Sequence, residues 1–309
     1  MGCRPARWRG RGAVAVLALL TALLLAACGG AAGDTGARGE GRAQTRGARG
    51  EIEIGSIPWD EDIAVTYLWK QVLEEKGYRI QVTQVEVAPL FAAVATGSID
   101  LFLDAWLPST HGRYMDRFGD QVEVLGTWYD RADLGLAVPG YVDARSIPDL
   151  KRYADRFGRR IVGIEAGAGL MRVTRERAMP GYGLDDWELV QSSTPTMLAE
   201  LDRAIKNREW IVVTLWRPHW AFAKYDIRYL EDPEGLMNPE GAEKLHVIAR
   251  EGFRQDFPEV ARWLRRFKMT EDQLAELEAA IQDHGPDQPE KGVQAWLEEN
   301  RHVVEAWLK

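Results

Sequence analysis

The sequence predicts an α/β protein in which most of the chain forms two units of alternating strands and helices. Short apolar strands and helical patterns follow one another from Glu51 to Phe102, and again over residues 147–216. This order predicts parallel sheets with right-handed crossovers. From residue 51 onward roughly 260 residues remain, enough for two domains of ordinary size. Because Cys3 and Cys28 are the only cysteines, and Cys3 lies in a predicted leader, the fold must rest on its apolar core.

Residues 1–27 are predicted to be a secretory signal. Four arginines precede an apolar run from Ala13 to Ala27, a pattern typical of such signals. The run is shorter than the roughly 20 residues that span a bilayer. Leu25-Ala-Ala-Cys28 resembles a bacterial lipobox, which predicts Cys28 as the lipidated first residue of the mature protein. An ordinary signal with an incidental cysteine is the alternative.

Residues 28–50 are rich in glycine, alanine and arginine and have no apolar periodicity. This composition predicts a flexible tether. The net charge is −8, and the loss of four arginines with the signal makes it −12. So acidic a chain argues against a nucleic-acid partner.

The first α/β unit is predicted from alternation, helical spacing and glycine stops. Gly55 and Pro58 end the first strand, and Gly77 and Gly97 end the first two helices. The expected elements are a strand over 51–57, a helix over 63–73, a strand over 79–87, a helix over 90–95 and a strand over 99–102 that leads into Trp106.

The second unit is expected to follow a short strand, Leu134–Val138, and a chain reversal at Pro139-Gly140 where the chain can cross between domains. Its expected elements are a helix opening at 147, a strand over 160–164, a glycine loop and helix over 165–174, a strand over 188–191, a helix over 196–204 and a strand over 211–213. A strand over 245–249 and amphipathic helices ending in Trp296 and Trp307 complete the chain.

Trp59, Trp106 and Trp216 each follow a predicted strand and sit beside proline, in loops that cannot readily bury an indole. In α/β domains the carboxyl ends of strands are where ligands bind. Three indole faces there would form a cage for a cation that cannot donate hydrogen bonds. Core packing remains the alternative for each one alone. Other tryptophans fall on helical stripes and are assigned to the core: Trp69, Trp263, Trp296 and Trp307.

The remaining motifs give no catalytic or metal chemistry. The loop Gly167-Ala-Gly169 between a strand and a helix either binds an anion at the helix start or is an ordinary tight turn. The five histidines lack metal-ligand spacing, and most are expected at the surface. No nucleophile motif is present, and the many carboxylates read as solvated helix faces. We therefore expect no catalytic residue, no metal and no cofactor.

Four motifs together resemble the glycine betaine and related compatible-solute binding proteins of ABC importers. They are Trp59-Asp-Glu-Asp-Ile-Ala, Gly97-Ser-Ile-Asp with Ala105-Trp-Leu-Pro-Ser-Thr-His111, Val162-Gly-Ile-Glu-Ala-Gly-Ala-Gly-Leu-Met, and Thr214-Leu-Trp-Arg-Pro-His-Trp. The resemblance covers nearly everything from Ile52 to Lys309.

The resemblance implies a two-lobed periplasmic-binding-protein (Venus-flytrap) fold, with a parallel-rich sheet in each lobe and the ligand in the cleft between them. With this chain's strand order, residues 51–138 plus 243–309 form lobe 1 and residues 139–242 form lobe 2. The implied binding residues are the three caging tryptophans, the backbone amides of Gly169 and Leu170 for a carboxylate, and His111 as an assisting hydrogen-bond donor. The implied partners are a small-molecule ligand, the permease subunits of an importer and, through Cys28, a membrane surface outside the cytoplasm.

Two positions depart from the family pattern. Ala166 stands where relatives often have proline, and Asp104 precedes a caging tryptophan where others can carry a neutral residue. An extra carboxylate there favours a ligand without a carboxylate, such as choline, so the ligand stays open among glycine betaine, proline betaine, choline and carnitine. The alternative from another class is an enzyme acting on methylated amines. Such an enzyme would need a nucleophile, metal or cofactor motif beside the cage, and the sequence contains none.

Overall fold

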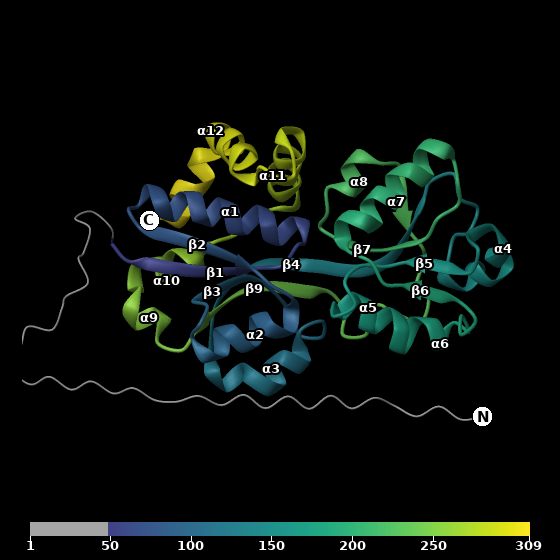
Figure 1. The fold of residues 1–309 in the computed structure, drawn as a ribbon, viewed down its shortest axis with the longest axis horizontal. Coiled ribbons are helices and arrows are strands. Elements are labelled where there is room, and N and C mark those ends of the chain that lie inside the picture. The colour runs from purple at the N-terminus through teal and green to yellow at the C-terminus, as the bar shows by residue number, and fades with distance from the viewer. Residues whose placement is uncertain (1–48) are drawn as a thin grey trace, which may run out of the picture. The chain divides into compact units, whose positions relative to one another are not determined.

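The computed structural model describes residues 49–309. The predicted signal, Cys28 and nearly all of the predicted tether lie outside the described residues. Within residues 49–309 no helix is both long and apolar enough to cross a membrane. The fold is α/β, as the alternation of strands and helices predicts (Figure 1).

The first sheet, sheet A, has the strand order β2-β1-β3-β9-β4. β1 pairs in parallel with both β2 and β3, whereas β9 runs antiparallel to β3 and to β4. The strands are β1 (Glu51–Ser56), β2 (Arg79–Gln84), β3 (Leu101–Leu107), β4 (Val122–Pro139) and β9 (Glu243–Arg250).

The second sheet, sheet B, continues from β4 in the order β4-β7-β5-β6, with β8 also paired to β4. β5 pairs in parallel with β6 and β7, and β4 runs antiparallel to β7 and β8. These strands are β5 (Arg160–Val162), β6 (Glu188–Val190), β7 (Val213–Arg217) and β8 (Ile227–Tyr229). Each sheet therefore has a parallel part, and every antiparallel pair contains β4 or β9.

One long strand, β4, belongs to both sheets. Its first part, from Val122 to Ala132, pairs with β9, and Asp133 to Ala137 pair with β7. The strand expected over 134–138 is the last part of β4, so the expected strand began too late, and the chain crosses between the sheets along β4 rather than at Pro139-Gly140. The pattern missed the first part of the strand because Asp130, Arg131 and Asp133 interrupt the apolar run although the chain stays extended.

Helices cover both faces of each sheet (Figure 1). Those of sheet A are α1 (Asp60–Glu75), α11 (Glu271–His284) and α12 (Pro289–Trp307) on one face and α2 (Val87–Thr96) and α3 (Gly112–Phe118) on the other. Those of sheet B are α7 (Thr194–Asn207) and α8 (Ala221–Lys224) opposite α5 (Gly169–Val173) and α6 (Met179–Gly181). The remaining helices are α4 (Ala154–Phe157), α9 (Phe253–Asp256), α10 (Pro258–Arg266) and three short helical turns at 119–121, 147–153 and 174–178.

Several helix ends follow the sequence signals. Gly97 closes α2 in the left-handed conformation with φ +76°, as predicted. Thr270 and Gln273 form a capping box at the start of α11. The strand expected over 79–87 was too long, because β2 ends at Gln84 and α2 begins at Val87. Pro89 lies in the first turn of α2, where the missing N–H needs no helical partner.

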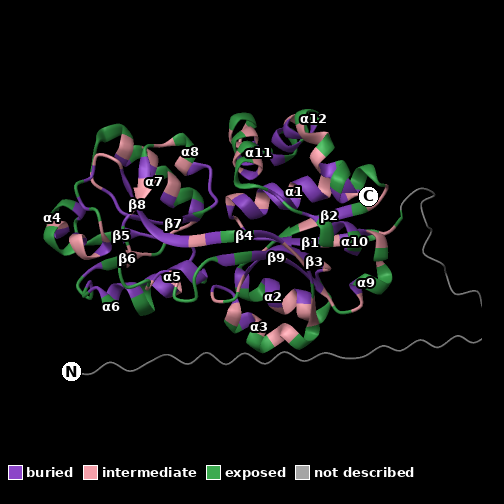
Figure 2. Cartoon of the chain, turned by 180° about the vertical axis from the view of Figure 1, so that it is seen from behind, coloured by how far each residue is buried: buried purple, intermediate pink, exposed green. Residues whose placement is uncertain are grey.

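Buried residues gather along the strands and on the helix faces that meet them (Figure 2). The indoles predicted to be structural are buried, with relative exposures of 0% for Trp69, 3% for Trp263, 4% for Trp296 and 5% for Trp307. The tryptophans expected in loops unable to bury an indole are buried as well, at 5% for Trp59, 2% for Trp106 and 3% for Trp216. That expectation was wrong for these two because Trp106 lies within β3 and Trp216 within β7, not in loops.

Gly292 of α12 provides a test of this packing. A Cβ there would lie 2.4 Å from the Cα of Ile281 in α11. Because backbone cannot move aside cheaply, Gly292→Ala should destabilise the protein by about 1–3 kcal/mol, as overpacking does. Gly112→Ala, in helix α3 with nothing within 4 Å of its Cβ, should be neutral or slightly stabilising. Urea unfolding of both variants makes the comparison, and equal midpoints would contradict the close approach of the two helices.

Candidate functional site

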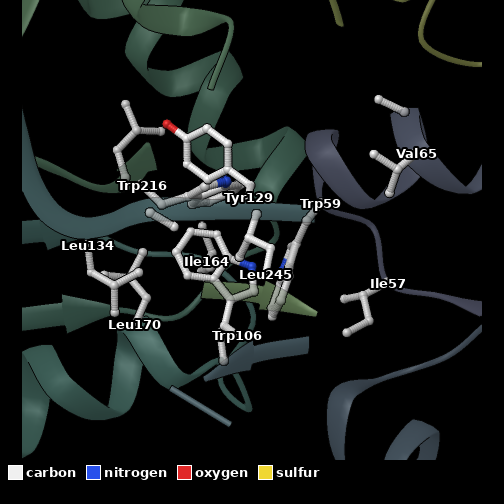
Figure 3. Packing of buried hydrophobic residues seen from close by; sticks show 14 of the residues in the cluster. Ile57, Trp59, Val65, Trp106, Tyr129, Leu134, Ile164, Leu170, Trp216 and Leu245 are labelled. Atoms are coloured by element: carbon white, nitrogen blue, oxygen red, sulfur yellow. The ribbon is translucent and has the colours of Figure 1, made fainter. Parts of the chain in front are cut away.

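A small cavity of about 20 Å³ lies between residues of sheet A and residues of sheet B. Five of the six predicted binding residues line it: Trp59, Trp106, Trp216, Gly169 and Leu170. The other lining residues are Glu61, Thr110, Leu134, Ile164 and Ala168. Figure 3 shows the three indoles pointing toward one another, with Leu134, Ile164 and Leu170 beside them. The structure thus brings the three tryptophans together with the start of helix α5.

Trp59 stands at the turn between β1 and α1, where it is the residue before the first turn of the helix. Asp62 fixes this turn by accepting hydrogen bonds from the backbone N–H of Ile57 at 2.5 Å and the hydroxyl of Ser56 at 2.9 Å. The Trp59 ring lies 6.3 Å from the ring of Trp216, tilted by 52°. A cation beside both rings would lie within the roughly 6 Å over which an indole face attracts it.

Trp106 and Trp216 come from strands of different sheets. Trp106 lies near the end of β3, and its indole N–H donates to Asp104 Oδ2 at 3.1 Å. Trp216 lies near the end of β7, directly opposite Leu134 of β4 in the antiparallel register. Its indole N–H donates to Glu61 Oε2 at 2.8 Å. The location at the carboxyl end of its strand agrees with the sequence-based expectation.

The loop after β3 presses against the start of α5. Glu243 of β9 holds this loop by accepting hydrogen bonds from the backbone and side chains of Ser109 and Thr110. Thr110 in turn packs so closely on Gly169 that a Cβ there would lie 2.7 Å from the Thr110 carbonyl oxygen. Gly169 is therefore required for this contact. It begins a helical backbone that continues to residue 181, and the first-turn amides of such a backbone have no partner within it.

His111 is brought to the site but does not line the cavity. Its ring stacks on Trp59 at 5.7 Å with 12° between the planes. Its Nδ1 accepts a hydrogen bond from the Trp106 backbone N–H at 2.9 Å, so the ring proton sits on Nε2. Burial and then the charges of Arg113 and Arg172 lower the pKa of His111 to about 3. The imidazole is therefore neutral at physiological pH, and its Nε2 has no protein partner among residues 49–309.

Buried carboxylates surround the tryptophans, contrary to the expectation of solvated helix faces. Glu61 and Asp62 of α1, Asp104 of β3 and Glu278 of α11 have exposures of 0–2%. Burial is the largest cause that raises the pKa of Asp62 to about 7, and it raises the pKa values of the other three well above their usual range. Glu61 lines the cavity although the local pattern of acids after Trp59 does not indicate it.

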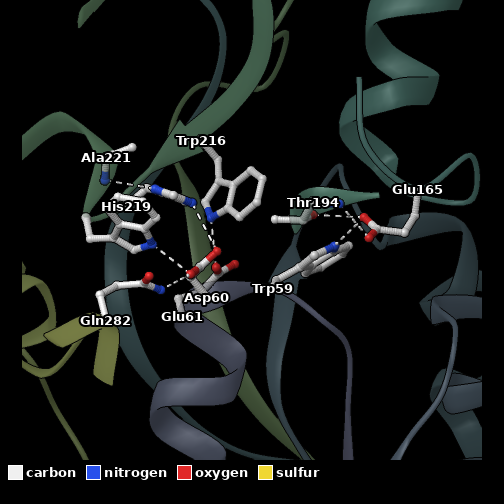
Figure 4. A network of polar contacts seen from close by, with 10 residues as sticks. Trp59, Asp60, Glu61, Glu165, Thr194, Trp216, His219, Ala221 and Gln282 are labelled. Carbon is white, nitrogen blue, oxygen red and sulfur yellow. Dashed lines mark hydrogen bonds and ion pairs between the residues drawn. The ribbon is translucent and has the colours of Figure 1, made fainter. Parts of the chain in front are cut away.

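Glu165 holds the third indole. It follows β5, and its Oε2 accepts the N–H of Trp59 at 3.4 Å and the hydroxyl of Thr194 at 2.9 Å (Figure 4). Its Oε1 accepts the backbone N–H of Thr194 at 2.8 Å, at the start of helix α7. His219, which was expected near the surface, is also buried, and its Nε2 lies 3.3 Å from Asp60 Oδ2. No group of residues in the described range 49–309 could hold a metal ion.

Comparison with known proteins identifies the family. Residues 50–299 match the OpuAC family, described as the substrate-binding domain of ABC-type glycine betaine transport systems. The chain belongs to this family. The resemblance inferred from the four motifs is thereby confirmed, and the class of protein is a transport receptor, not an enzyme.

Individual relatives agree with this assignment. The glycine betaine/carnitine transport binding protein GbuC of Listeria monocytogenes is 37% identical over 159 residues, which span 51% of this chain and 51% of that relative. The chain thus matches about half the length of this curated relative. Lactococcal OpuAC in its closed conformation with glycine betaine shares 33% identity and a TM-score of 0.77, over 84% of this chain and 99% of that one.

A choline-binding protein of an ABC transporter, solved with choline, shares 26% identity and a TM-score of 0.75, over 84% of this chain and 91% of that one. The structural similarity confirms the predicted α/β periplasmic-binding-protein fold. The lobe boundaries remain a prediction.

Two glycines of the same loop allow a matched test of the contact between the β3 loop and α5. Gly169→Ala should weaken ligand binding by about tenfold or more, because the new Cβ displaces Thr110 from the cavity wall. Gly167→Ala, with nothing within 4 Å of its Cβ, should bind as the wild type does. Isothermal titration calorimetry with glycine betaine measures both, and a tight-binding Gly169→Ala variant would refute the contact's role.

Proposed function

We propose that the protein captures glycine betaine or a close quaternary-ammonium analogue in the cavity between the two sheets. The observation that carries this proposal is the convergence on one cavity of three indole rings, two from strands of different sheets and one from the turn before α1, beside the start of a helix. A trimethylammonium group is weakly hydrated and has no N–H, so it gains from indole faces, each worth about 0.5–2 kcal/mol.

The carboxylate of such a zwitterion needs donors rather than aromatic faces. Gly169 and Leu170 at the start of α5 line the same cavity, and their backbone amides would offer donors without a buried counter-charge. The neutral ring of His111, with its proton on Nε2, stacks on Trp59 and does not line the cavity, so its role as a further donor stays a prediction. Ammonium and carboxylate recognition would then lie at two ends of one cavity.

A choline- or carnitine-type ligand is the second candidate within the same class. Glu61 lines the cavity, and Asp104 lies directly behind Trp106. Acidic groups favour a ligand with net positive charge. A relative that binds choline shares this fold. An enzyme acting on methylated amines is not supported, because the family consists of transport receptors.

The proposed role in transport follows from the two-sheet arrangement. Trp59 and Trp106 belong to the sheet A side, whereas Trp216 and Gly169 belong to the sheet B side. A ligand that contacts both sides favours a closed arrangement over an open one. We infer that the closed, loaded protein delivers its ligand to the permease subunits of an ABC importer for osmoprotection, from a lipid anchor at Cys28 on the outer face of the membrane.

The cage can be tested by substitution of its tryptophans. Trp59→Ala and Trp216→Ala should each weaken glycine betaine binding by roughly ten- to a hundred-fold, as loss of a central aromatic does. Phenylalanine at these positions should keep part of the affinity because the π face remains. Trp210→Phe, a half-buried tryptophan outside the cavity, is the control. Calorimetry with glycine betaine, proline betaine, choline and carnitine gives the ranking of ligands, and wild-type affinity in all the alanine variants would exclude the cage.

The anchor requires a separate test. Cys28→Ala should remove the lipid attachment, and the protein should then appear in the soluble extracytoplasmic fraction or stay unprocessed. Metabolic labelling with a fatty acid and membrane fractionation distinguish these outcomes from wild type. Unchanged labelling and membrane association would show that Cys28 is not the anchor.

A further inference from the structure

Each of the three indoles that line the cavity donates its N–H to a carboxylate that is at least nine-tenths buried. The pairs are Trp59 with Glu165 at 3.4 Å, Trp106 with Asp104 at 3.1 Å and Trp216 with Glu61 at 2.8 Å. A buried indole N–H needs an acceptor, but a carbonyl or hydroxyl would serve. The repeated choice of an acidic acceptor therefore calls for a reason beyond satisfying the donor.

Two of the three pairs join the two sides of the cavity (Figure 4). Trp216 lies on β7 of sheet B, and its acceptor Glu61 lies on α1, which follows β1 of sheet A. Trp59 precedes α1, and its acceptor Glu165 follows β5 of sheet B. Separation of the two sides would remove the acceptor from both indoles at once. The closed arrangement thus fixes the orientation of two cage walls.

The charge of these acceptors also acts on the rings. A hydrogen bond to an anion polarises its donor, and electron density pushed into the indole strengthens the attraction of its face for a cation. Keeping a carboxylate buried is unfavourable unless something compensates its charge. The second oxygen of Glu61, Oε1, has no protein partner among residues 49–309 although it is buried at the cavity. A cation in the cage would supply the missing compensation.

We propose that Glu61 and Glu165 are positioning residues of the cage, which complete it from the opposite side when the cleft closes and tune its indoles for a cation. This inference rests on the proposed function, because it takes the ligand to be a quaternary ammonium compound. It assigns a specificity role to two residues that need not touch the ligand.

A pH dependence follows for cationic ligands. Burial first, and then the charges of Asp104 on β3 and Glu278 on α11, raise the pKa of Glu61 well above its usual range. Asp104 and Glu278 have acidic neighbours of their own, Asp62 beside Asp104 and Asp60 beside Glu278. A bound cation favours the ionised form of Glu61, so binding releases a proton. Affinity for a cation should therefore rise with pH and be lost as Glu61 becomes protonated at lower pH.

The decisive variant is Glu61→Gln, which keeps an acceptor oxygen for the Trp216 N–H and removes the charge. The probes are choline and 3,3-dimethylbutan-1-ol, its neutral carbon counterpart of nearly the same shape. Glu61→Gln should weaken choline binding by about tenfold and leave the neutral probe within about twofold of wild type. The rise of choline affinity with pH should also flatten. Glu165→Gln should act in the same direction but less, because its bond to the indole is longer.

Asp60→Asn is the matched control. Asp60 accepts the N–H of Trp220 at 2.6 Å, which is also a pair between the two sides, but Trp220 does not line the cavity. Because Asp60→Asn acts only on the equilibrium between the open and closed arrangements, it should change the affinity for choline and for the neutral probe by the same factor. Equal weakening of both probes by Glu61→Gln would reduce Glu61 to a packing role and overturn the proposal. An equal change of the choline-to-neutral ratio in Asp60→Asn would overturn it too, because the effect would belong to the acidic cluster as a whole.

A measurement without ligand tests the bond itself. In protein labelled with ¹⁵N-tryptophan, the Trp216 indole N–H, assigned with Trp216→Phe, should exchange with solvent about tenfold faster or more in Glu61→Ala. Glu61→Gln should keep the slow exchange. Unchanged exchange in Glu61→Ala would refute the bond across the cleft. A wild type that binds neither choline nor glycine betaine would overturn the proposed function, and the exchange result would still decide on the bond.

Discussion

A buried indole N–H must be bonded, and the arrangement of the whole site follows from this constraint. A quaternary ammonium group cannot accept a hydrogen bond, so an aromatic cage for it has to direct each indole N–H away from the ligand and toward the protein. Here the acceptors are carboxylates, and two of them reach across from the opposite sheet. The same buried acidic side chains therefore orient the indoles and join the two sides of the cavity.

The backbone supports this solution through β4. Because β4 pairs with β9 in sheet A and with β7 in sheet B, the two sheets share a strand, and Leu134, at its crossing point, lies opposite Trp216. The cavity sits next to this crossing, between Trp59 and Trp106 on one side and the start of α5 on the other. Glu243 of β9 holds the β3 loop against Gly169, so both sheets contribute to the wall where a ligand carboxylate would lie.

Periodicity and glycine or proline signals in the sequence were sufficient to predict the strand–helix alternation and the convergence of the three tryptophans, because these features depend on local patterns. The first part of the shared strand was missed since Asp130, Arg131 and Asp133 break the apolar run although the backbone stays extended. The burial of the caging indoles was also missed. Carboxylates such as Glu61 and Glu278 have no local signature of burial, because their environment is created by helices that are distant in sequence.

We propose that the three indoles and the start of α5 bind opposite ends of one zwitterion. A crystal structure of the protein grown with glycine betaine would locate both ends of the ligand. We expect density for the trimethylammonium group among Trp59, Trp106 and Trp216, with the carboxylate at the amides of Gly169 and Leu170. Glycine betaine bound at another place, or bound with its carboxylate among the indoles, would contradict this proposal.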